Sequence, residues 1–530
     1  MDRYTIFALV VLLAVVSAVG LAYAPWAWMP LAIFGALSAL GVYDVIQRRH
    51  AILRNYPVIG HMRFLFEGIR PEIRQYLIEN DHDEEPFSRE TRSIVYQRAK
   101  GVEDKRPFGT QKRVYDAGYE WLTHSMVPKH LADTDFRVRI GGPECKQPYD
   151  ASIYNISAMS FGALSANAIS ALNKGAKMGG FAHDTGEGGI SRYHREGGGD
   201  LIYEVGSGYF GCRKADGTFD PDKFAETAAD PQVKLIELKL SQGAKPGHGG
   251  MLPASKISPE IADARGIPMG VDCISPASHS AFSNPMEMME FIGLLRERSG
   301  GKPVGFKFCV GHRREFMCVV KAMLKTGIVP DFIVVDGKEG GTGAAPLEFA
   351  NHMGMPLVEG LTFVHNTLRG AGLRDQIKLG ASGKVVTAFD IARVLALGAD
   401  WANSARGFMF AIGCIHAQAC HTNECPVGVA TQDKLRQRAL DVDDKSHRVA
   451  RFHRNTLKAL GEMTGAAGLD HPSDFLPHHL LMREKDHEMV TGQEVYPYLP
   501  EGFLVRGEED AFGYLMRWRR SRASSFDPIE

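Results

Sequence analysis

Three of the chain's eight cysteines stand close together in the stretch from Cys414 to Gln432, which reads CIHAQACHTNECPVGVATQ. Cys414, Cys420 and Cys425 are separated by five and then four residues. A disulfide pairs two thiols, so the third would stay unpaired. The spacing leaves three interpretations open: an iron–sulfur cluster, a zinc site formed by these cysteines with His421, or packed thiols that bind nothing.

A second group of residues suited to chemistry is rich in glycine. The 57 glycines of the chain include the runs TGEGG at 185–189, QGAKPGHGG at 242–250 and DGKEGGTGAAP at 336–346. Glycines in such runs let the backbone adopt positive φ or approach another group closely. The pattern is typical of phosphate and cofactor loops more than of flexible linkers.

Short apolar runs alternate with helical patterns from Tyr154 onward, and these elements would position the loops. The strand candidates are YNISAM, FAHDT, VKLIELKL, GVDCIS, VGFKFCV, DFIVVDG, IKLGAS and DWANSA. The helix candidates include SANAISALNKGAKMG, PMEMMEFIGLLRERSG, REFMCVVKAMLKTG and TAFDIARVLALG. Such repeated units predict an α/β protein with a closed (β/α)8 TIM barrel over residues 150–435, whose chemistry lies at the carboxyl ends of the strands.

The first fifty residues differ from the rest of the chain. No charged side chain occurs between Arg3 and Asp44, and the run divides at residues 23–30 into two apolar halves. Each half is close to the length of about 20 residues with which a helix crosses a bilayer. Residues 1–50 are therefore expected to form a two-helix transmembrane hairpin, in contact with the lipid bilayer through residues 4–45.

The residues that flank the two halves predict their orientation. Trp26 and Trp28 lie in the turn, as amphipathic aromatic side chains do at a membrane interface. Three arginines follow the second half: Arg48, Arg49 and Arg54. The positive-inside rule then places the catalytic domain on the cytoplasmic side of the inner (cytoplasmic) membrane. A cleaved signal peptide is the competing hypothesis, because the triplet AYA at 22–24 resembles a cleavage site.

The remaining segments are expected to flank the barrel. Residues 51–149 form a polar approach segment in which IRPEIRQYLIEN and SRETRSIVYQRAK predict amphipathic helices. Residues 436–530 are expected to be a helical and then irregular extension. The formal net charge of −1 favours no nucleic-acid partner, and the scattered cysteines indicate a reducing compartment.

Five motifs occur in the same order as in a known family. They are MSFGALSANAISALNKGA (159–176), TGEGG (185–189), QGAKPGHGG (242–250), DGKEGGTGAAP (336–346) and CHTNECPVGVATQ (420–432). Residues 150–435 thereby resemble the FMN and iron–sulfur domain of the glutamate synthase large chain. The resemblance implies an FMN-binding (β/α)8 barrel, with a 3Fe-4S cluster held by Cys414, Cys420 and Cys425.

FMN requires a platform for its ring, a cradle for its phosphate and a positive group near the pyrimidine edge. The resemblance, together with the phosphate position after the last two strands of many barrels, implies the following cofactor-binding residues: Ala158, Met159, Ser160, Gln242, Lys307, Gly340, Gly341, Ser382, Gly383, Lys384, Ser404 and Arg406. Two simpler explanations stay open. Lys307 would also fit a strand-end lysine that reaches solvent, and Gly340-Gly341 would fit a plain turn.

In the family, 2-oxoglutarate is held by residues that map onto Lys245, Arg265 and Glu187. Two cations suit the two carboxylates of such a substrate, although Arg265 would also fit the surface of a helix. Glu187 could donate a proton during imine formation only if burial raised its pKa. The family's glutamine and a second glutamate are replaced here by Met251 and His248, which leaves the identity of the substrate open.

The resemblance implies reduction of 2-iminoglutarate, formed from 2-oxoglutarate and ammonia, to L-glutamate. A glutaminase domain is missing and no strand leads into a GxGxxG helix. Electrons are therefore expected from a ferredoxin-like or other partner protein, and ammonia from solution or a separate amidotransferase subunit. Two alternatives are an N-methylglutamate synthase-like enzyme that acts on another amine or 2-oxo acid, and a non-catalytic redox relay or membrane scaffold.

Overall fold

The computed structural model describes residues 3–82, 85–485, 488–507 and 512–528. The chain divides into two compact units, Met1–Arg89 and Glu90–Glu530. The four domains expected from the sequence, with their three boundaries, stay predictions.

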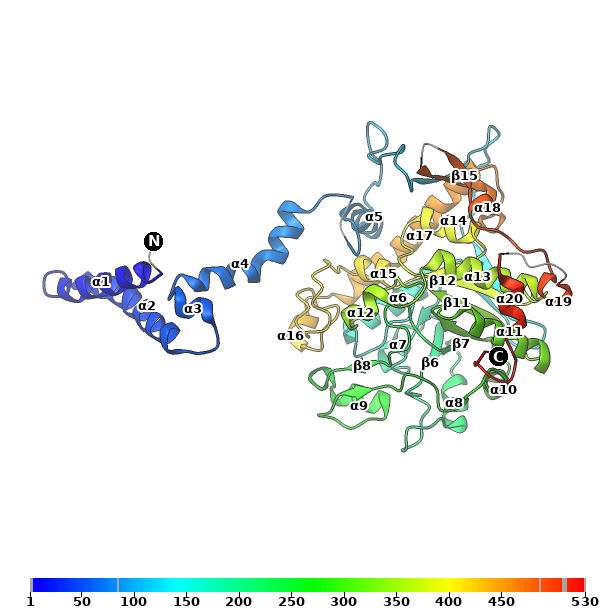
Figure 1. The fold of residues 1–530 in the computed structure, drawn as a ribbon, viewed down its shortest axis with the longest axis horizontal. Coiled ribbons are helices and arrows are strands. Elements are labelled where there is room, and N and C mark those ends of the chain that lie inside the picture. Colours follow the sequence, from blue (N-terminus) through cyan, green and yellow to red (C-terminus); the bar gives the residue numbers. More distant parts are fainter. Residues whose placement is uncertain (1–2, 83–84, 486–487, 508–511, 529–530) are drawn as a thin grey trace. The chain divides into compact units, whose positions relative to one another are not determined.

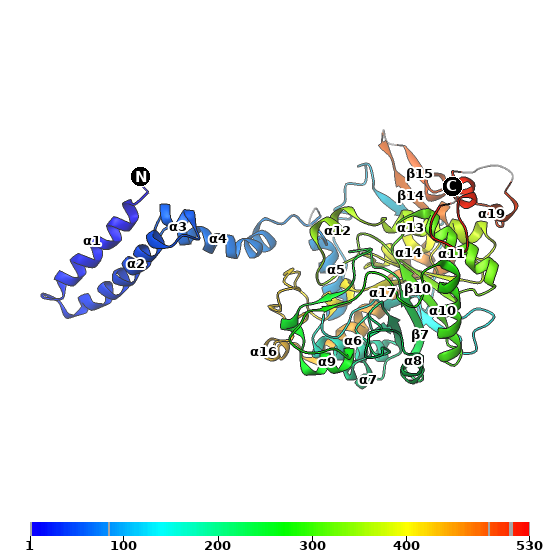
Figure 2. The same cartoon turned by 60° about the horizontal axis from the view of Figure 1, so that its bottom comes forward.

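The larger unit is built on a closed barrel of eight parallel strands, which confirms the predicted fold class (Figure 1). In barrel order the strands are β4 (Tyr154–Ile156), β5 (His183–Asp184), β6 (Leu201–Val205), β7 (Val233–Lys239), β10 (Val304–Phe308), β11 (Phe332–Asp336), β12 (Lys378–Ser382) and β13 (Trp401–Ser404). β13 pairs with β4, with Asn403 opposite Asn155, and this pairing closes the ring. Helices surround the ring in both views (Figure 2).

One predicted barrel strand is wrong, and one real strand was not predicted. GVDCIS contributes only β9 (Cys273–Ile274), which pairs antiparallel with β8 (Met251–Leu252) outside the barrel. Ile274 is 70% exposed there, so its apolar side chain does not belong to a core. The missing strand is LIYEV, or β6, whose five residues are all buried. Its Glu204 interrupts the apolar run that marks a buried parallel strand.

The four predicted barrel helices are confirmed, and their ends follow local chemistry. They are α6 (Ala166–Gly179), α10 (Pro285–Arg298), α11 (Arg313–Thr326) and α14 (Ala388–Ala396). Ser165 caps α6 by accepting a hydrogen bond from the N–H of Ala168 (3.1 Å), and Gly180 ends it at a φ of +65°. Side-chain caps and C-terminal glycines satisfy backbone groups that a helix leaves unpaired.

Other helices of the larger unit complete its outer layer. They are α5 (Arg89–Lys100), α7 (Arg192–Glu196), α8 (Pro221–Ala228), α9 (Pro259–Arg265), α12 (Leu347–His352), α13 (Leu357–Gly370), α15 (Arg406–Ala411), α16 (Lys434–Gln437), α17 (Val442–Ala466), α18 (Gly492–Val495), α19 (Phe503–Arg506) and α20 (Tyr514–Arg519). The longest, α17, packs along α6, where a Cβ on Gly175 would lie 2.5 Å from Val449.

Two small antiparallel sheets also belong to the larger unit. One pairs β2 (Arg137–Ile140) with β3 (Tyr149–Ser152), and the other joins β1 (Glu120–Leu122), β14 (Leu480–Arg483) and β15 (Met489–Thr491). They lie outside the barrel ring.

The smaller unit consists of helices, namely α1 (Thr5–Gly20), α2 (Trp28–Ile46), α3 (Ala51–Asn55), α4 (Gly60–Ile73) and the π-helical η2 (Arg74–Ile78). α1 and α2 lie side by side in both views (Figures 1 and 2). Within the described residues, one apolar helix, Pro25–Ile46, has the length and composition to cross a membrane, whereas Thr5–Gly20 is shorter. The two-span hairpin therefore stays a prediction.

Candidate active site at the carboxyl ends of the strands

Charged side chains from four segments meet near the carboxyl ends of β5 and β7. Glu187, in the TGEGG loop after β5, accepts a hydrogen bond from the Lys239 ammonium at the end of β7 (2.8 Å). Lys245 of the QGAKPG loop and Arg265 of α9 also act electrostatically on Glu187. Both are buried, at 4% and 5% exposure. Three cations therefore surround one carboxylate, and we call these four residues the cationic cluster.

Arg265 connects this cluster to the loop after β4. Its Nη2 lies 3.4 Å from Oγ of Ser160 and donates to the carbonyl oxygen of Phe161 (3.3 Å). Its Cζ lies 5.1 Å from the ring centroid of Phe210, within the range of a cation–π contact. The alternative of a helix-surface arginine is wrong, because the side chain is enclosed. Ser160 and its buried neighbour Met159 belong to the predicted ring platform.

Two glycines of the predicted motifs make the close approach of these loops possible. A Cβ on Gly250 would lie 2.4 Å from Oε1 of Glu187, and a Cβ on Gly243 would lie 1.7 Å from the carbonyl oxygen of Gly337. The N–H of Gly243 donates to Oδ2 of Asp336 at the end of β11 (2.8 Å). The QGAKPG loop therefore packs directly on the DGKEGG loop, where no larger residue fits.

The ionisation of Glu187 differs from the sequence-based expectation of a raised pKa. Burial alone would raise the pKa, but the Lys239 ion pair and hydrogen bond, with the charges of Arg265 and Lys245, lower the pKa of Glu187 to about 2. A group that is ionised throughout the neutral range holds no proton to donate. The expected proton-donor role is therefore corrected, and Glu187 is an acceptor that orients Lys239.

Lys307 is buried near the end of β10, in register with Lys239 of β7. Its ammonium is 2.9 Å from Glu237 of β7 and 3.7 Å from Asp184 of β5, and it also contacts Glu204 of β6. Oxygens of the three carboxylates all lie within 4.8 Å of one another. We call these four residues the lumen cluster. The simpler explanation of a lysine that reaches solvent is wrong, since Lys307 is 3% exposed.

Burial governs the protonation of the lumen cluster. It raises the pKa of Asp184 well above its ordinary value, although the Lys307 ammonium acts in the opposite direction. Burial raises the pKa of Glu237 as well. Three carboxylates that share one ammonium in a dry interior cannot all be charged at acceptable free energy. The geometry thus favours a retained proton among these carboxyls.

The two predicted phosphate loops follow β12 and β13, as expected. Ser382 ends β12, with its Oγ 3.3 Å from that of Ser157 after β4. Gly383 and Lys384 follow at φ values of +141° and +53°, and N–H groups in such turns form concave anion sites. Ser404 ends β13 and is followed at once by α15, whose first N–H groups have no partner within the helix.

Arg406, in the second of these loops, contacts two other predicted segments. Its Nη2 donates to the carbonyl oxygen of Thr342, and a Cβ on Gly341 would lie 2.8 Å from its Nε. Its Nη1 lies 3.8 Å from Sγ of Cys420. The guanidinium therefore links the Gly340-Gly341 turn to the cysteine segment. Gly340 has no positive φ. Glycine is therefore needed in this turn for close packing and not for an unusual backbone conformation.

The cysteine segment combines free thiols with a buried lysine. Cys414 and Cys425 are buried, Cys420 is half-buried, and none of the three forms a disulfide. The buried Lys256 ammonium donates to the carbonyl oxygens of Cys420 (2.8 Å) and Ala430 (3.3 Å). Burial raises the pKa of the Cys414 thiol to about 11, and metal binding would deprotonate such a thiol.

Two observations bear on the zinc hypothesis. His421, the fourth ligand of the zinc hypothesis, is exposed. A tetrahedral zinc with Zn–S bonds of about 2.3 Å requires closely gathered sulfurs, yet in the described part of the chain only the lumen carboxylates converge within 4.8 Å. Lys256 and Arg406 add positive charge beside the thiols, which stabilises thiolate ligands.

The two residues that depart from the family pattern lie near the cationic cluster. His248 is half-buried, and its ring stands edge-on to Phe349 at 5.2 Å. Met251 begins β8 beside Gly250 and is 48% exposed. Gln242 is half-buried in the same loop. The loop that carries the substitutions is thus the loop that carries Lys245.

Two functional candidates were missed by the sequence analysis. Lys239 ends β7 two residues after Glu237, and alternation along a strand directs both side chains into the barrel. That spacing could have identified Lys239. Lys256 gave no comparable signal, because its contact with Cys420 depends on the tertiary fold and joins residues 164 positions apart.

Comparison with known proteins agrees with this geometry. A family described as a conserved region in glutamate synthase matches residues 144–470. The glutamate synthase large subunit-like protein YerD of Bacillus subtilis is 40% identical over 491 residues, which are 85% of this chain and 93% of YerD. The chain therefore belongs to the glutamate synthase family, a family of oxidoreductases.

Other matches cover a smaller share of the chain or have lower sequence identity. The archaeal glutamate synthase (NADPH) of Methanocaldococcus jannaschii is 35% identical over 316 residues, and the chain spans 59% of that relative's length. The solved structure of mandelate oxidase with 3,3-difluoro-2-hydroxy-3-phenylpropionic acid is 14% identical, covers 70% of this chain and 87% of its own, and gives a TM-score of 0.41. The second likeness carries no functional inference.

Proposed function

We propose that the chain is an FMN- and iron–sulfur-dependent oxidoreductase of glutamate synthase type, which converts 2-oxoglutarate and ammonia through 2-iminoglutarate to L-glutamate. The observation that carries this proposal is the charge balance of the cationic cluster. Glu187 neutralises one of its three cations, which leaves two for a ligand. Two buried cations match the two carboxylates of 2-oxoglutarate.

The roles of the individual cations follow from their surroundings. Arg265 is fixed by Ser160 and Phe161 and presents a rigid fork that suits a carboxylate. Burial lowers the pKa of Lys245, and an anion bound beside it would raise that pKa again. Lys239 is already paired with Glu187 and helps to hold that carboxylate in place.

Residues at the ends of β4, β11, β12 and β13 fit an FMN molecule. The turn at Gly383-Lys384 and the start of α15 offer N–H groups for its phosphate, Arg406 adds a cation, and Met159-Ser160 forms a buried floor. When bound, FMN would supply hydride to the imine carbon of the substrate. Lys307 would act on it only indirectly, through the electrostatics of the barrel interior.

Cys414, Cys420 and Cys425 would hold a 3Fe-4S cluster, and the neighbouring Lys256 and Arg406 support this assignment. We expect Cys420→Ser to lose bound iron and acid-labile sulfide. Cys318→Ser, in the core of α11, is the matched control and should keep both. Equal iron content in the two variants would contradict the cluster assignment.

Product analysis tests the reaction itself. The purified protein, loaded with FMN and reduced anaerobically with dithionite, should be reoxidised by 2-oxoglutarate with ammonium and form one L-glutamate per two electrons. Reoxidation should fail when either substrate is left out. Protein that binds FMN but is never reoxidised by this pair would refute the proposed reaction.

One observation favours an alternative reaction in which an alkylated amine replaces ammonia. Met251 places a thioether where the family has an amide, and it follows Gly250, where a Cβ would lie 2.4 Å from Glu187. Loss of a polar group there would admit an alkylated amine, as in an N-methylglutamate synthase-like reaction. The same assay decides between the two, because methylamine in place of ammonium would yield N-methylglutamate.

We also propose a separate electron-donor protein and a membrane anchor formed by the smaller unit. The run GSGYFG at 206–211 follows β6 but opens no helix among the described residues, so it is not a dinucleotide-binding turn, which supports the first proposal. The apolar helix Pro25–Ile46 supports the second. Fractionation of cells that express the full chain would place it in the membrane pellet, resistant to extraction by high salt. Recovery in the soluble fraction would contradict the anchor.

A further inference from the structure

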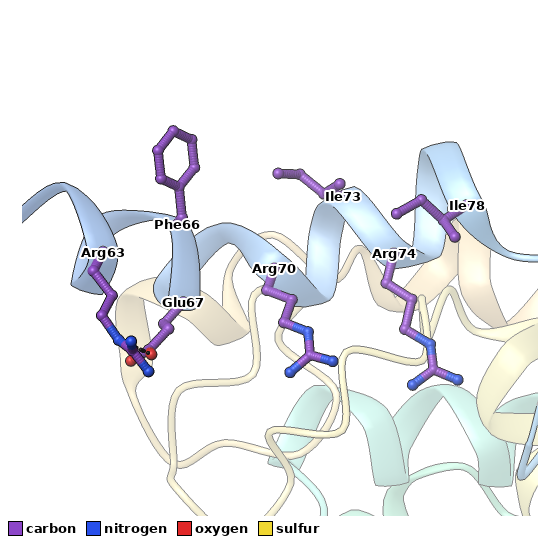
Figure 3. Close-up of a pocket in the computed structure, with 7 residues that line it drawn as sticks. All are labelled: Arg63, Phe66, Glu67, Arg70, Ile73, Arg74 and Ile78. Carbon is purple, nitrogen blue, oxygen red and sulfur yellow. Dashed lines mark hydrogen bonds and ion pairs between the residues drawn. The ribbon is translucent and has the colours of Figure 1, made fainter.

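The helix α4 and the adjoining η2 carry apolar side chains along one face and charged side chains along another. Apolar side chains at the spacing of one helical face form a row: Met62, Leu65, Phe66, Ile69 and Ile73. Arg63, Arg70 and Arg74 form a second row, with Glu67 among them. Figure 3 shows Phe66, Ile73 and Ile78 directed to one side, and the three arginines and Glu67 to the other. Both rows border a pocket of about 600 Å³.

The apolar row is open to solvent. Leu65 and Phe66 are 54% and 56% exposed, and in η2 Leu77 and Ile78 reach 80% and 72%. In α4 only Gly60 is buried. A helix of 14 residues without tertiary packing is marginally stable in water, so this segment requires another surface to cover it.

A buried carboxylate fixes where α4 begins. Asp44, near the end of α2, is fully buried and accepts hydrogen bonds from the Val58 N–H (2.9 Å) and from His61 Nε2 (2.9 Å). On the same face of α2, one turn earlier, a Cβ on Gly41 would lie 2.3 Å from Phe7. The first turn of α4 is thus attached to the end of the apolar helix, where that helix would leave a membrane.

The charge around α4 indicates what kind of surface would cover its apolar row. Between residues 47 and 75 there are six arginines, two glutamates and no other charged residue, whereas the whole chain has a net charge of −1. Arginines beside an apolar face are typical of helices that lie in the headgroup region of anionic membranes. Each cation near such a surface contributes about 1 kcal/mol.

We propose that α4 and η2 form a membrane-surface helix that inserts its apolar row among the acyl chains and binds anionic headgroups through Arg63, Arg70 and Arg74. This inference rests on the proposed membrane anchor, because the anchor brings the segment to the lipid. A protein partner for the same face is the competing occupant.

Hydrogen exchange of the full chain in lipid nanodiscs tests the proposal. With phosphatidylglycerol added to phosphatidylcholine, amides of residues 60–78 should exchange about tenfold more slowly than in phosphatidylcholine alone. Replacing the three arginines by serine should abolish this difference. Phe66→Ser should weaken protection in both lipids, whereas Phe64→Ser, whose ring contacts His50 instead, is the matched control and should not.

The outcomes separate the two proposals. Strong protection of residues 28–46 in nanodiscs, with equal exchange of residues 60–78 in both lipids, would leave the anchor intact and overturn the surface helix. Protection of residues 60–78 that depends on an added protein and not on phosphatidylglycerol would overturn it as well. A chain that never enters nanodiscs would refute the anchor itself.

Discussion

Two charge clusters lie next to each other in the barrel, and they are unbalanced in opposite directions. The lumen cluster sets three carboxylates against one ammonium, whereas the cationic cluster sets three cations against one carboxylate. Lys239 stands between them, 2.8 Å from Glu187 and 3.8 Å from Glu204. The clusters therefore face each other across a single side chain.

The difference in location explains the difference in role. The lumen cluster is buried inside the strand ring, where a retained proton, together with the Lys239 ammonium 3.8 Å from Glu204, relieves its excess negative charge. The cationic cluster lies at the carboxyl ends of the strands, where ligands enter a barrel of this kind, so its excess positive charge can be relieved by an anion. The first cluster is therefore tested through stability and the second through binding.

The largest effect is expected from Lys307→Met, which removes the only ammonium of the lumen cluster. Breaking a buried ion pair in this way typically costs about 3 to 5 kcal/mol. The free energy of unfolding in urea should fall accordingly. Lys378→Met, on the partly exposed lysine of β12, should change it little. An unfolding midpoint unaffected by Lys307→Met would show that the lumen charges are not paired as described.

A smaller loss is expected for Lys245→Met, on the binding side of the comparison. Removing a hydrogen bond to a charged group costs about 1.5 to 3 kcal/mol, so the KM for 2-oxoglutarate should rise roughly 10- to 150-fold. FMN content should stay at the wild-type level, as it should in the exposed control Lys214→Met. Release of FMN from Lys245→Met would instead assign this lysine to cofactor binding.

The protonation of the lumen cluster predicts a dependence of stability on pH. Burial raises the pKa of Glu237 in the folded chain, so the folded state keeps a proton that the unfolded state loses. This contribution is complete below the unfolded pKa of about 4.3 and disappears as pH rises through the folded pKa. Glu237→Gln has no carboxyl proton to lose. As pH rises, the free energy of unfolding of the variant should therefore increase relative to that of the wild type.

The control for this measurement is Glu297→Gln, on the exposed face of α10. Its stability should follow the wild-type pH curve. A Glu237→Gln curve that also runs parallel to the wild type would mean that the lumen carboxyls are all ionised.

The smallest effect is expected in the pH profile of Glu187→Gln. Because the paired carboxylate has a pKa of about 2, it stays ionised over the whole working range. The variant should be slower, since Lys239 loses its partner, but its curve of log kcat/KM against pH should run parallel to that of the wild type. Disappearance of an acid or base limb in the variant would give Glu187 the proton-transfer role that its surroundings argue against.

Much of the fold follows from patterns in the sequence, whereas the charge clusters do not. The apolar strands and capped helices are local features, and the glycine motifs already marked the loops of the candidate site. β6 was missed because a glutamate such as Glu204 normally indicates an exposed position, whereas in the closed barrel it is buried. The lumen cluster joins β5, β6, β7 and β10, so no short segment contains its pattern.

The candidate site shows the same division. Lys245 and Glu187 lie in recognisable loops, but the burial of Arg265 depends on Ser160 and Phe210, which are distant in sequence. The low pKa of Glu187 likewise arises from Lys239, 52 residues away. The number of cations and carboxylates at the site follows from the folded structure, because the loops that carry them are far apart in the sequence.

The most direct test of the central claim is equilibrium binding of two 2-oxo acids to the oxidised, FMN-loaded protein, followed by the flavin difference spectrum. If two free cations define the site, dianionic 2-oxoglutarate should bind at least tenfold more tightly than monoanionic 2-oxobutyrate, a difference of about 1.4 kcal/mol. Equal affinity for the two acids would contradict the claim that the cationic cluster selects a dicarboxylate.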